Sequence, residues 1–144
     1  MADVLFRELG FPILLVDPPL VEVRGEQVPD VNMSELQEAV FRSLAVFPAR
    51  LTGAQLRFVR KHLRLRQADL ADVLNMANHS VVSQWESKED GPTGMAYNTE
   101  VVLRLWMAAK TGMPEEPLDL LERRLKGLSP HREEPLEIEM PQAA

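Results

Sequence analysis

The sequence predicts a mainly α-helical protein. We expect a helix-turn-helix domain of five helices, preceded by a small β hairpin or meander with one helix, and followed by a disordered C-terminal tail. Three observations predict this class. Apolar residues recur at helical spacing between Ser34 and Lys126, they alternate with polar residues at Val21–Arg24, and proline and glutamate accumulate after Ser129. The expected parts are therefore residues 1–49, 50–127 and 128–144.

The N-terminal part begins with short apolar runs between turn residues. Phe11–Val16 and Leu20–Val23 flank Asp17-Pro18-Pro19, and the turn Arg24-Gly25-Glu26 precedes the run Val28–Val31. Alternation of apolar and polar residues favours strands here, arranged as a hairpin or a meander.

Two helix starts carry the same capping pattern. Ser34 with Gln37 predicts a helix that ends near Phe47, and Thr52 with Gln55 predicts the first helix of the helix-turn-helix domain. In each pair the hydroxyl oxygen accepts a hydrogen bond from a first-turn N–H, and the glutamine side chain accepts one in return.

Two further helices are expected near the C-terminus. Asn98 or Thr99 is expected to cap the first, and Glu115–Lys126 to form the second. The expected inward stripes are Val102, Leu105, Trp106 and Ala109 in the first helix, and Leu118, Leu121 and Leu125 in the second. Either stripe closes the domain core or forms a dimer interface.

The most informative segment is Gln67–Glu86, which predicts two short helices separated by a turn. The residues expected to face inward are Leu70, Ala71 and Leu74 in the first helix, and Val82 and Trp85 in the second. The residues then left outside are Asn78, His79, Ser80, Ser83 and Gln84. Amide and hydroxyl side chains in this place suit a helix that enters the major groove of double-stranded DNA.

Positive charge is concentrated around the same segment. Residues 50–88 hold seven basic and three acidic side chains, whereas residues 1–49 hold three and eight, and residues 89–144 hold six and eleven. Contact with DNA phosphates requires such local positive charge, and Arg57, Arg64 and Lys88 are candidates for it. The acidic flanks would repel DNA and suit a basic protein partner.

Several function classes find no support in the sequence. No apolar run approaches the roughly 18 residues of a membrane span, and the absence of cysteine excludes disulfides and thiolate zinc sites. The histidines are scattered, and no glycine-rich phosphate loop is present. We therefore expect a cytoplasmic protein, associated with the nucleoid when bound to DNA, that is not an enzyme and uses no metal or cofactor.

Residues Thr52–Trp106 resemble the lambda-repressor-like (XRE) helix-turn-helix domain. The resemblance is carried by the phrases LTGAQLRFVRK, QADLADVL, SVVSQWE and TEVVLRLW. More narrowly, the chain is similar to the YgiT-type, MqsA-like antitoxins. The resemblance implies a homodimeric repressor that binds a palindromic operator, regulates its own operon and acts as the antitoxin of a type II toxin-antitoxin pair. The alternative is a stand-alone or phage-type repressor with no toxin partner.

The resemblance also implies roles for the polar residues of the motif. It implies that Gln67 meets a phosphate and that Ser80 and Gln84 read bases, and glutamine suits adenine. Arg60 and Glu86 match an ion pair that joins the first helix of the domain to the end of the recognition helix.

The second helix of the motif, expected to be the recognition helix, also contains two apolar residues, Val81 and Trp85, for which other roles are expected. Val81 either touches a thymine methyl group or packs behind the reading surface, and Trp85 is expected in the core rather than against a base.

The N-terminal part resembles the group less closely. MqsA-like proteins often carry a Cys-x-x-Cys-Gly zinc knuckle before the helix-turn-helix domain. Val21–Pro29 keeps the Gly-Glu and Pro of that pattern but has valine and arginine at the cysteine positions. The segment is either a degenerate knuckle without metal or an unrelated hairpin. In the antitoxin interpretation, residues 1–49 hold a basic ribonuclease toxin.

Overall fold

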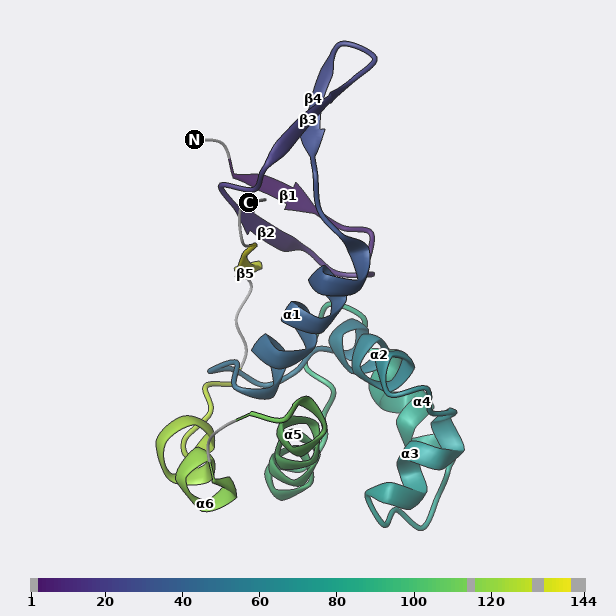
Figure 1. Cartoon of the computed structure of the whole chain (residues 1–144). Coiled ribbons are helices and arrows are strands. Elements are labelled where there is room, and N and C mark those ends of the chain that lie inside the picture. The colour runs from purple at the N-terminus through teal and green to yellow at the C-terminus, as the bar shows by residue number, and fades with distance from the viewer. Residues whose placement is uncertain (1–2, 114–115, 131–133, 141–144) are drawn as a thin grey trace. The chain divides into compact units, whose positions relative to one another are not determined.

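The computed structural model describes residues 3–113, 116–130 and 134–140 (Figure 1). In chain order it contains β1 (Val4–Phe6), β2 (Ile13–Val16), β3 (Leu20–Val23), β4 (Glu26–Pro29), α1 (Met33–Ala45), α2 (Gly53–His62), α3 (Gln67–Val73), α4 (Ser80–Glu86), α5 (Tyr97–Thr111), α6 (Pro117–Leu120), a π-helical turn (Leu121–Leu125) and β5 (Leu136–Glu139). The chain divides into two compact units. Unit 1 is Met1–Val40 with Glu134–Ala144, and unit 2 is Phe41–Glu133.

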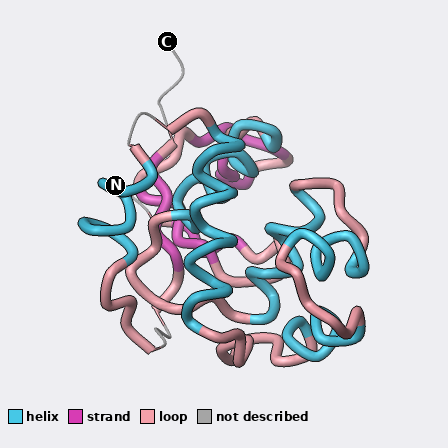
Figure 2. The backbone as a smooth tube through the Cα atoms, turned by 90° about the horizontal axis from the view of Figure 1, so that it is seen from below, coloured by secondary structure: helices cyan, strands magenta, loops and turns pink. Residues whose placement is uncertain are grey.

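The expected fold class is wrong. Over the described residues the chain forms six α-helices and five strands in two small sheets, so it is mixed α and β. A mainly α protein with a five-helix domain and a single hairpin does not account for the three-stranded sheet. Every described strand belongs to unit 1, whereas unit 2 consists of helices and loops (Figure 2).

The three-stranded sheet of unit 1 has the order β1-β2-β5 and joins the two ends of the chain. β1 is antiparallel to β2, and β5 is parallel to it. Ile13 pairs with Leu136 and Leu15 with Ile138, and all four side chains are buried. The tail expected to be disordered therefore contains a strand, stabilised by the apolar side chains that it buries.

The second sheet of unit 1 is the hairpin β3–β4, with Val21 opposite Val28 and Val23 opposite Glu26. Arg24 and Gly25 form its two-residue turn with φ values of 52° and 82°. Positive φ at both positions is the geometry of the type I′ turn, which matches the twist of the paired strands. The turn therefore lies where the sequence predicts it.

Helix α1 begins two residues earlier than predicted, and Asn32 caps it instead of Ser34. The Asn32 side-chain oxygen accepts from the backbone N–H of Glu35 at 3.0 Å. Asparagine and serine are both strong capping residues, so the two positions compete in the sequence. The apolar stripe of Leu36, Val40 and Leu44 is buried as expected.

Helix α2 begins with the predicted capping box. The Thr52 hydroxyl oxygen accepts from the Gln55 N–H at 3.1 Å, and the Gln55 side chain accepts from the Thr52 N–H at 2.9 Å. The loop after α4 completes this end, because the carbonyl oxygens of Gly91 and Glu89 accept from the N–H groups of Gly53 and Ala54. The N–H groups that begin α2 are thereby satisfied.

Helix α5 is rotated relative to the prediction. Val102 is 54% exposed, and Ala109 is also exposed, whereas Leu103 and Met107 are completely buried. The helix also begins earlier, with Ala96 at the N-cap position and no side-chain cap from Asn98 or Thr99. The expected stripe is wrong at Val102 and Ala109, although Leu105 packs against the apolar cluster described below, because two of the buried residues of α5, Glu100 and Arg104, are charged.

The last predicted helix is shorter and changes its winding. Residue 115, its expected start, lies outside the described residues, α6 begins at Pro117, and a π-helical turn follows. A π-helix brings residues five apart together, so Leu120 and Leu125 are both buried while Leu118 is 74% exposed. Their contacts with Val101 and Ala108 form a small apolar cluster between α5 and this turn.

Candidate nucleic-acid interface

Helix α4 has one buried side and one polar exposed side. Val82, Trp85 and Glu86 are 0%, 7% and 2% exposed, and the helix packs against α2 and α3. Leu70 and Ala71 of α3 are completely buried, as a close crossing of the two helices requires. Trp85 thus belongs to the core, and the side chains on the opposite side of α4 are free to meet a ligand.

The exposed residues at α4 include all five that the sequence placed outside. Asn78, His79, Ser80, Ser83 and Gln84 are exposed, and Val81 is intermediate. All five are short or medium polar side chains that can donate or accept hydrogen bonds, which is the chemistry of a base edge.

Three of these side chains are hydrogen-bonded to one another. Asn78 Oδ1 accepts from the Ser80 N–H at 2.9 Å and from Ser80 Oγ at 2.8 Å. Gln84 Nε2 donates to Ser80 Oγ at 3.5 Å. Asn78 therefore caps the start of α4, and its side-chain oxygen is not turned outward as a reading group.

His79 is bound to the preceding helix. Its Nε2 lies 2.8 Å from Asp72 Oδ1 of α3, and both side chains are more than half exposed. The contact joins the turn to α3, and His79 faces solvent at the start of α4.

A bidentate ion pair fastens the end of α4 to α2. Arg60 Nε donates to Glu86 Oε2 at 2.6 Å and Arg60 Nη2 donates to Glu86 Oε1 at 3.1 Å, while the Glu86 side chain is 3% exposed. These are the two residues that the family resemblance pairs. The planar guanidinium fits both carboxylate oxygens at once, which fixes orientation as well as distance.

Two of the side chains predicted to contact phosphates, Gln67 and Arg57, instead form hydrogen bonds within the fold. The Gln67 side-chain amide donates to Glu86 Oε1 at 3.2 Å. Arg57 donates to Glu89 at 2.9 Å and to the Glu86 carbonyl oxygen at 3.1 Å, and its bonds to Glu89 raise its pKa. Both side chains hold α2, α3 and the end of α4 together.

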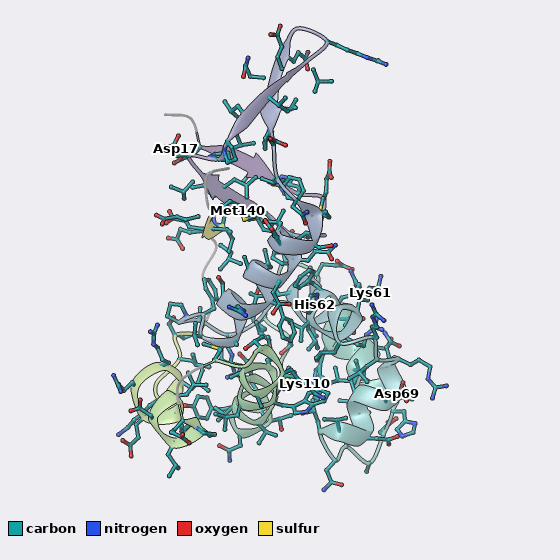
Figure 3. The ribbon with its side chains drawn as sticks, in the orientation of Figure 1. Asp17, Lys61, His62, Asp69, Lys110 and Met140 are labelled. Carbon is teal, nitrogen blue, oxygen red and sulfur yellow. The ribbon has the colours of Figure 1, made fainter. Side chains whose placement is uncertain are left out.

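The basic segment carries less available positive charge than its composition indicates. Its ion-paired cations are Arg50 with Glu100, Arg57 with Glu89, Arg60 with Glu86, and Arg66 with Asp69. Lys61, Arg64 and Lys88 are exposed and form no ion pair with any residue that the structure describes. Lys61 and the paired Asp69 are labelled in Figure 3. Phosphate attraction is therefore expected mainly from these three cations.

Gly53 lies where α2 comes closest to the end of α4. A Cβ at this position would be 2.6 Å from the Glu86 carbonyl oxygen, 2.7 Å from the Trp85 carbonyl oxygen and 2.8 Å from the Glu89 nitrogen. All three are backbone atoms, so only glycine fits without moving α4.

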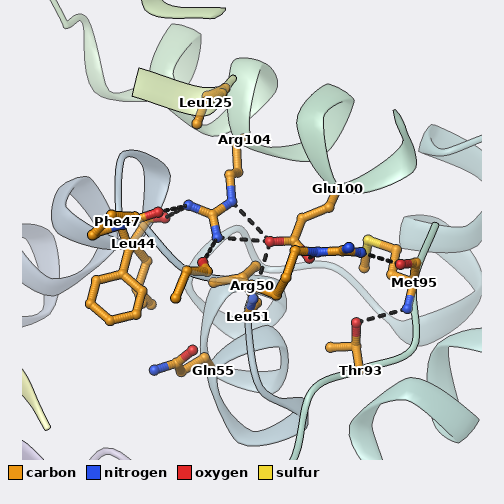
Figure 4. Close-up of polar contacts among 12 residues, drawn as sticks. Leu44, Phe47, Arg50, Leu51, Gln55, Thr93, Met95, Glu100, Arg104 and Leu125 are labelled. Atoms are coloured by element: carbon orange, nitrogen blue, oxygen red, sulfur yellow. Dashed lines mark hydrogen bonds and ion pairs between the residues drawn. The ribbon is translucent and has the colours of Figure 1, made fainter. Parts of the chain in front are cut away.

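The buried network around Arg104 is a feature that the sequence analysis missed (Figure 4). Arg104 and Glu100 are completely buried, and Arg104 Nη2 donates to Glu100 Oε2 at 2.7 Å. Arg104 also donates to the carbonyl oxygens of Leu44, Phe47 and Ala49, and burial lowers its pKa. The network ties α5 to the last turn of α1 and to the segment between α1 and α2. The four-residue spacing of Glu100 and Arg104 on an apolar helix is the signal that could have shown it.

Over the described residues no helix is long and apolar enough to span a membrane, and no cluster of three histidine, aspartate or glutamate side chains could hold a metal ion. No family model, curated protein or solved structure matches the chain. The resemblance to the XRE and MqsA-like groups therefore rests on its motifs alone and stays a prediction.

Proposed function

We propose that the protein is a sequence-specific DNA-binding transcriptional regulator that places α4 in the major groove of double-stranded DNA. The proposal rests on the contrast between the two sides of α4. Val82, Trp85 and Glu86 are buried, whereas Ser80, Ser83 and Gln84 are exposed on the other side. A helix held by its buried face and presenting amide and hydroxyl groups outward is suited to read base edges.

The charge distribution supports the same assignment. Unit 2 contains 14 basic and 11 acidic residues, and unit 1 contains 2 and 11. The unit that contains α4 thus has a net positive charge, although the whole chain is acidic with a net charge of −6. In this proposal Lys61, Arg64 and Lys88 supply contacts to phosphates, which position the protein without specifying sequence.

We further propose that two copies bind a palindromic operator as a homodimer and repress their own operon. The two-fold symmetry of a dimer matches half-sites about 34 Å apart on one face of the duplex.

A selection and a salt titration test this function. The full chain selects ligands from a random duplex library, and fluorescence anisotropy compares the selected duplex with a shuffled one over a salt series. We expect preferential binding of the selected duplex, with affinity falling steeply as salt rises. Arg64→Ala should reduce the salt slope by about one unit. Arg66→Ala is the matched control and should change the slope less, because Asp69 already neutralises Arg66. Equal, weak binding of both duplexes would contradict the proposal.

A second candidate function is the neutralisation of a basic protein, as in the antitoxins that the sequence resembles. Unit 1 carries a net charge of −9, and its hairpin exposes Leu20, Val21 and Val23 by 41–48%. Carboxylates around an exposed apolar hairpin suit a partner with positive charge and an apolar patch.

The partner experiment needs the full chain, because residues 1–49 lack β5 and so lack one strand of the unit 1 sheet. The full chain is co-expressed with the product of the adjacent gene. Co-purification that is lost on Val21→Asp and kept on Val102→Asp would support this candidate. A product that is neither toxic nor retained would leave the stand-alone regulator.

A further inference from the structure

We propose that Asn78 and Ser80 are positioning residues that fix the side-chain amide of Gln84 in the orientation that reads adenine. The proposal rests on the DNA-binding function above and names the base that this site selects. It is carried by the three hydrogen bonds at the start of α4, which have only one consistent polarity.

The polarity begins at the backbone of Ser80. An N–H group can only donate, so the Asn78 atom that lies 2.9 Å from it must be the oxygen and not the amide nitrogen. Ser80 Oγ lies 2.8 Å from the same Asn78 oxygen. Because that oxygen cannot donate, the serine hydroxyl must direct its only proton to it.

The direction of the Ser80 hydroxyl proton then determines which amide atom of Gln84, one helical turn further on, can bind Ser80 Oγ. With its proton directed to Asn78, Ser80 Oγ offers only lone pairs to Gln84, which must approach with Nε2, as it does at 3.5 Å. The opposite amide orientation would place Oε1 of Gln84 against those lone pairs. At 3.5 Å this contact is long and weak, so it favours one orientation of the Gln84 amide and contributes little to the stability of the helix.

The orientation leaves Gln84 with Oε1 as an acceptor and one N–H as a donor. Adenine presents a donor at N6 and an acceptor at N7 in the major groove, which match these two groups. Guanine presents acceptors at both N7 and O6, so Oε1 would face a second acceptor. An amide biased towards this orientation therefore prefers adenine more strongly than an unconstrained glutamine.

The test measures base preference at every position of the duplex selected by the wild-type chain. Each base pair is changed in turn, and anisotropy gives the relative affinities for the wild type and for Gln84→Ala, Ser80→Ala and Asn78→Ala. All three substitutions should relax preference at the same adenine, by about 10-fold for Gln84→Ala. Ser80→Thr and Asn78→Asp keep the hydroxyl and the acceptor, so they should retain the preference. Asn78→Asp should only weaken binding to all duplexes through its added charge.

The outcomes distinguish failure of the proposed orientation of Gln84 by Asn78 and Ser80, called the relay below, from failure of the DNA-binding function on which it rests. If Ser80→Ala relaxes a different base pair from Gln84→Ala, serine reads a base directly and the relay is wrong. Unchanged preference in Ser80→Ala would also overturn it, while leaving the DNA-binding function intact. If the wild type selects no sequence, both proposals fail. Thermal unfolding of each variant shows that any loss of preference does not come from loss of the fold.

Discussion

Gly53 shows how a single residue sets the position of the proposed reading helix. The backbone atoms of Trp85, Glu86 and Glu89 occupy the space that a side chain would need. We predict that Gly53→Ala lowers the free energy of unfolding by about 2 kcal/mol, because α4 must move to admit the methyl group. Urea denaturation measures the change. Gly91→Ala is the matched control, since its Cβ would meet only one backbone atom, at 3.3 Å. Equal effects of the two substitutions would contradict this account.

Asp69 gives a second prediction at the same scale. Its hydrogen bonds with Arg66 hold its pKa at about 2, below the usual 3.8. A depressed carboxyl pKa contributes stability above the unfolded-state pKa, and that contribution is lost as pH falls through about 2. NMR titration of the Asp69 carboxyl should therefore give a midpoint near 2 in the wild type and a higher one in Arg66→Ala, still below the usual value because the backbone N–H of residue 66 continues to donate to Asp69. Arg64→Ala should leave the midpoint unchanged, and a wild-type midpoint near 3.8 would exclude the pairing.

Single residues were predictable where one local rule acted alone. Thr52 and Gln55 form their capping box because no competing cap lies beside them. Asn32 displaced Ser34 because both are good capping residues only two positions apart, and the sequence does not rank them. The roles of Gln67 and Arg57 were not predictable, because their partners lie far along the chain, Glu86 at the end of α4 and Glu89 in the loop after it.

At the scale of elements, the Arg60–Glu86 pair decides how α4 is held against α2. We predict that Arg60→Met lowers the free energy of unfolding by about 3 kcal/mol, because it leaves a buried carboxylate with weaker partners. Arg60→Met with Glu86→Leu should recover part of that loss, because no unpaired charge remains. Urea denaturation of both variants checks this. A double variant no more stable than Arg60→Met would show that the charge is not what destabilises the single variant.

Helix α5 shows why periodicity located a helix but not its buried side. The expected inward stripe was Val102, Leu105, Trp106 and Ala109. Of these, Leu105 packs inward, but the buried side is formed mainly by Leu103, Met107 and the charged pair Glu100 and Arg104. Because apolar periodicity is read on the assumption that charged residues are exposed, it cannot identify a buried side that contains Glu100 and Arg104. The backbone partners of Arg104 are carbonyl oxygens of the last turn of α1 and of the segment that follows it, and these come near Arg104 only once the chain is folded.

At the scale of the whole molecule, the strand β5 brings the end of the chain into unit 1. The pattern Leu-Glu-Ile-Glu at Leu136–Glu139 alternates as a strand should, but its composition suggested a disordered tail. The partner strand β2 lies near the other end of the sequence, and no local rule reveals such a pairing. The helices of the motif were predictable because each depends on residues within one or two turns.

We predict that Ile138→Asp unfolds the unit 1 sheet while unit 2 stays folded. An aspartate at a side chain that is 3% exposed should cost about 3 kcal/mol. Trp85 and Trp106 both belong to unit 2, so tryptophan fluorescence reports on that unit alone. Circular dichroism should lose strand signal with the fluorescence transition unchanged. Glu137→Ala, at an exposed position of β5, is the control, and a parallel loss of both signals in Ile138→Asp would show that the units do not fold separately.

The most direct test of the central claim is the affinity of Gln84→Ala for the selected and shuffled duplexes. If the exposed side of α4 reads bases, affinity for the selected duplex should fall by about 1–3 kcal/mol, and affinity for the shuffled duplex should not change. Gln27→Ala, on the hairpin of unit 1, is the matched control and should affect neither. Equal losses on both duplexes, or none on either, would show that α4 is not the element that reads DNA.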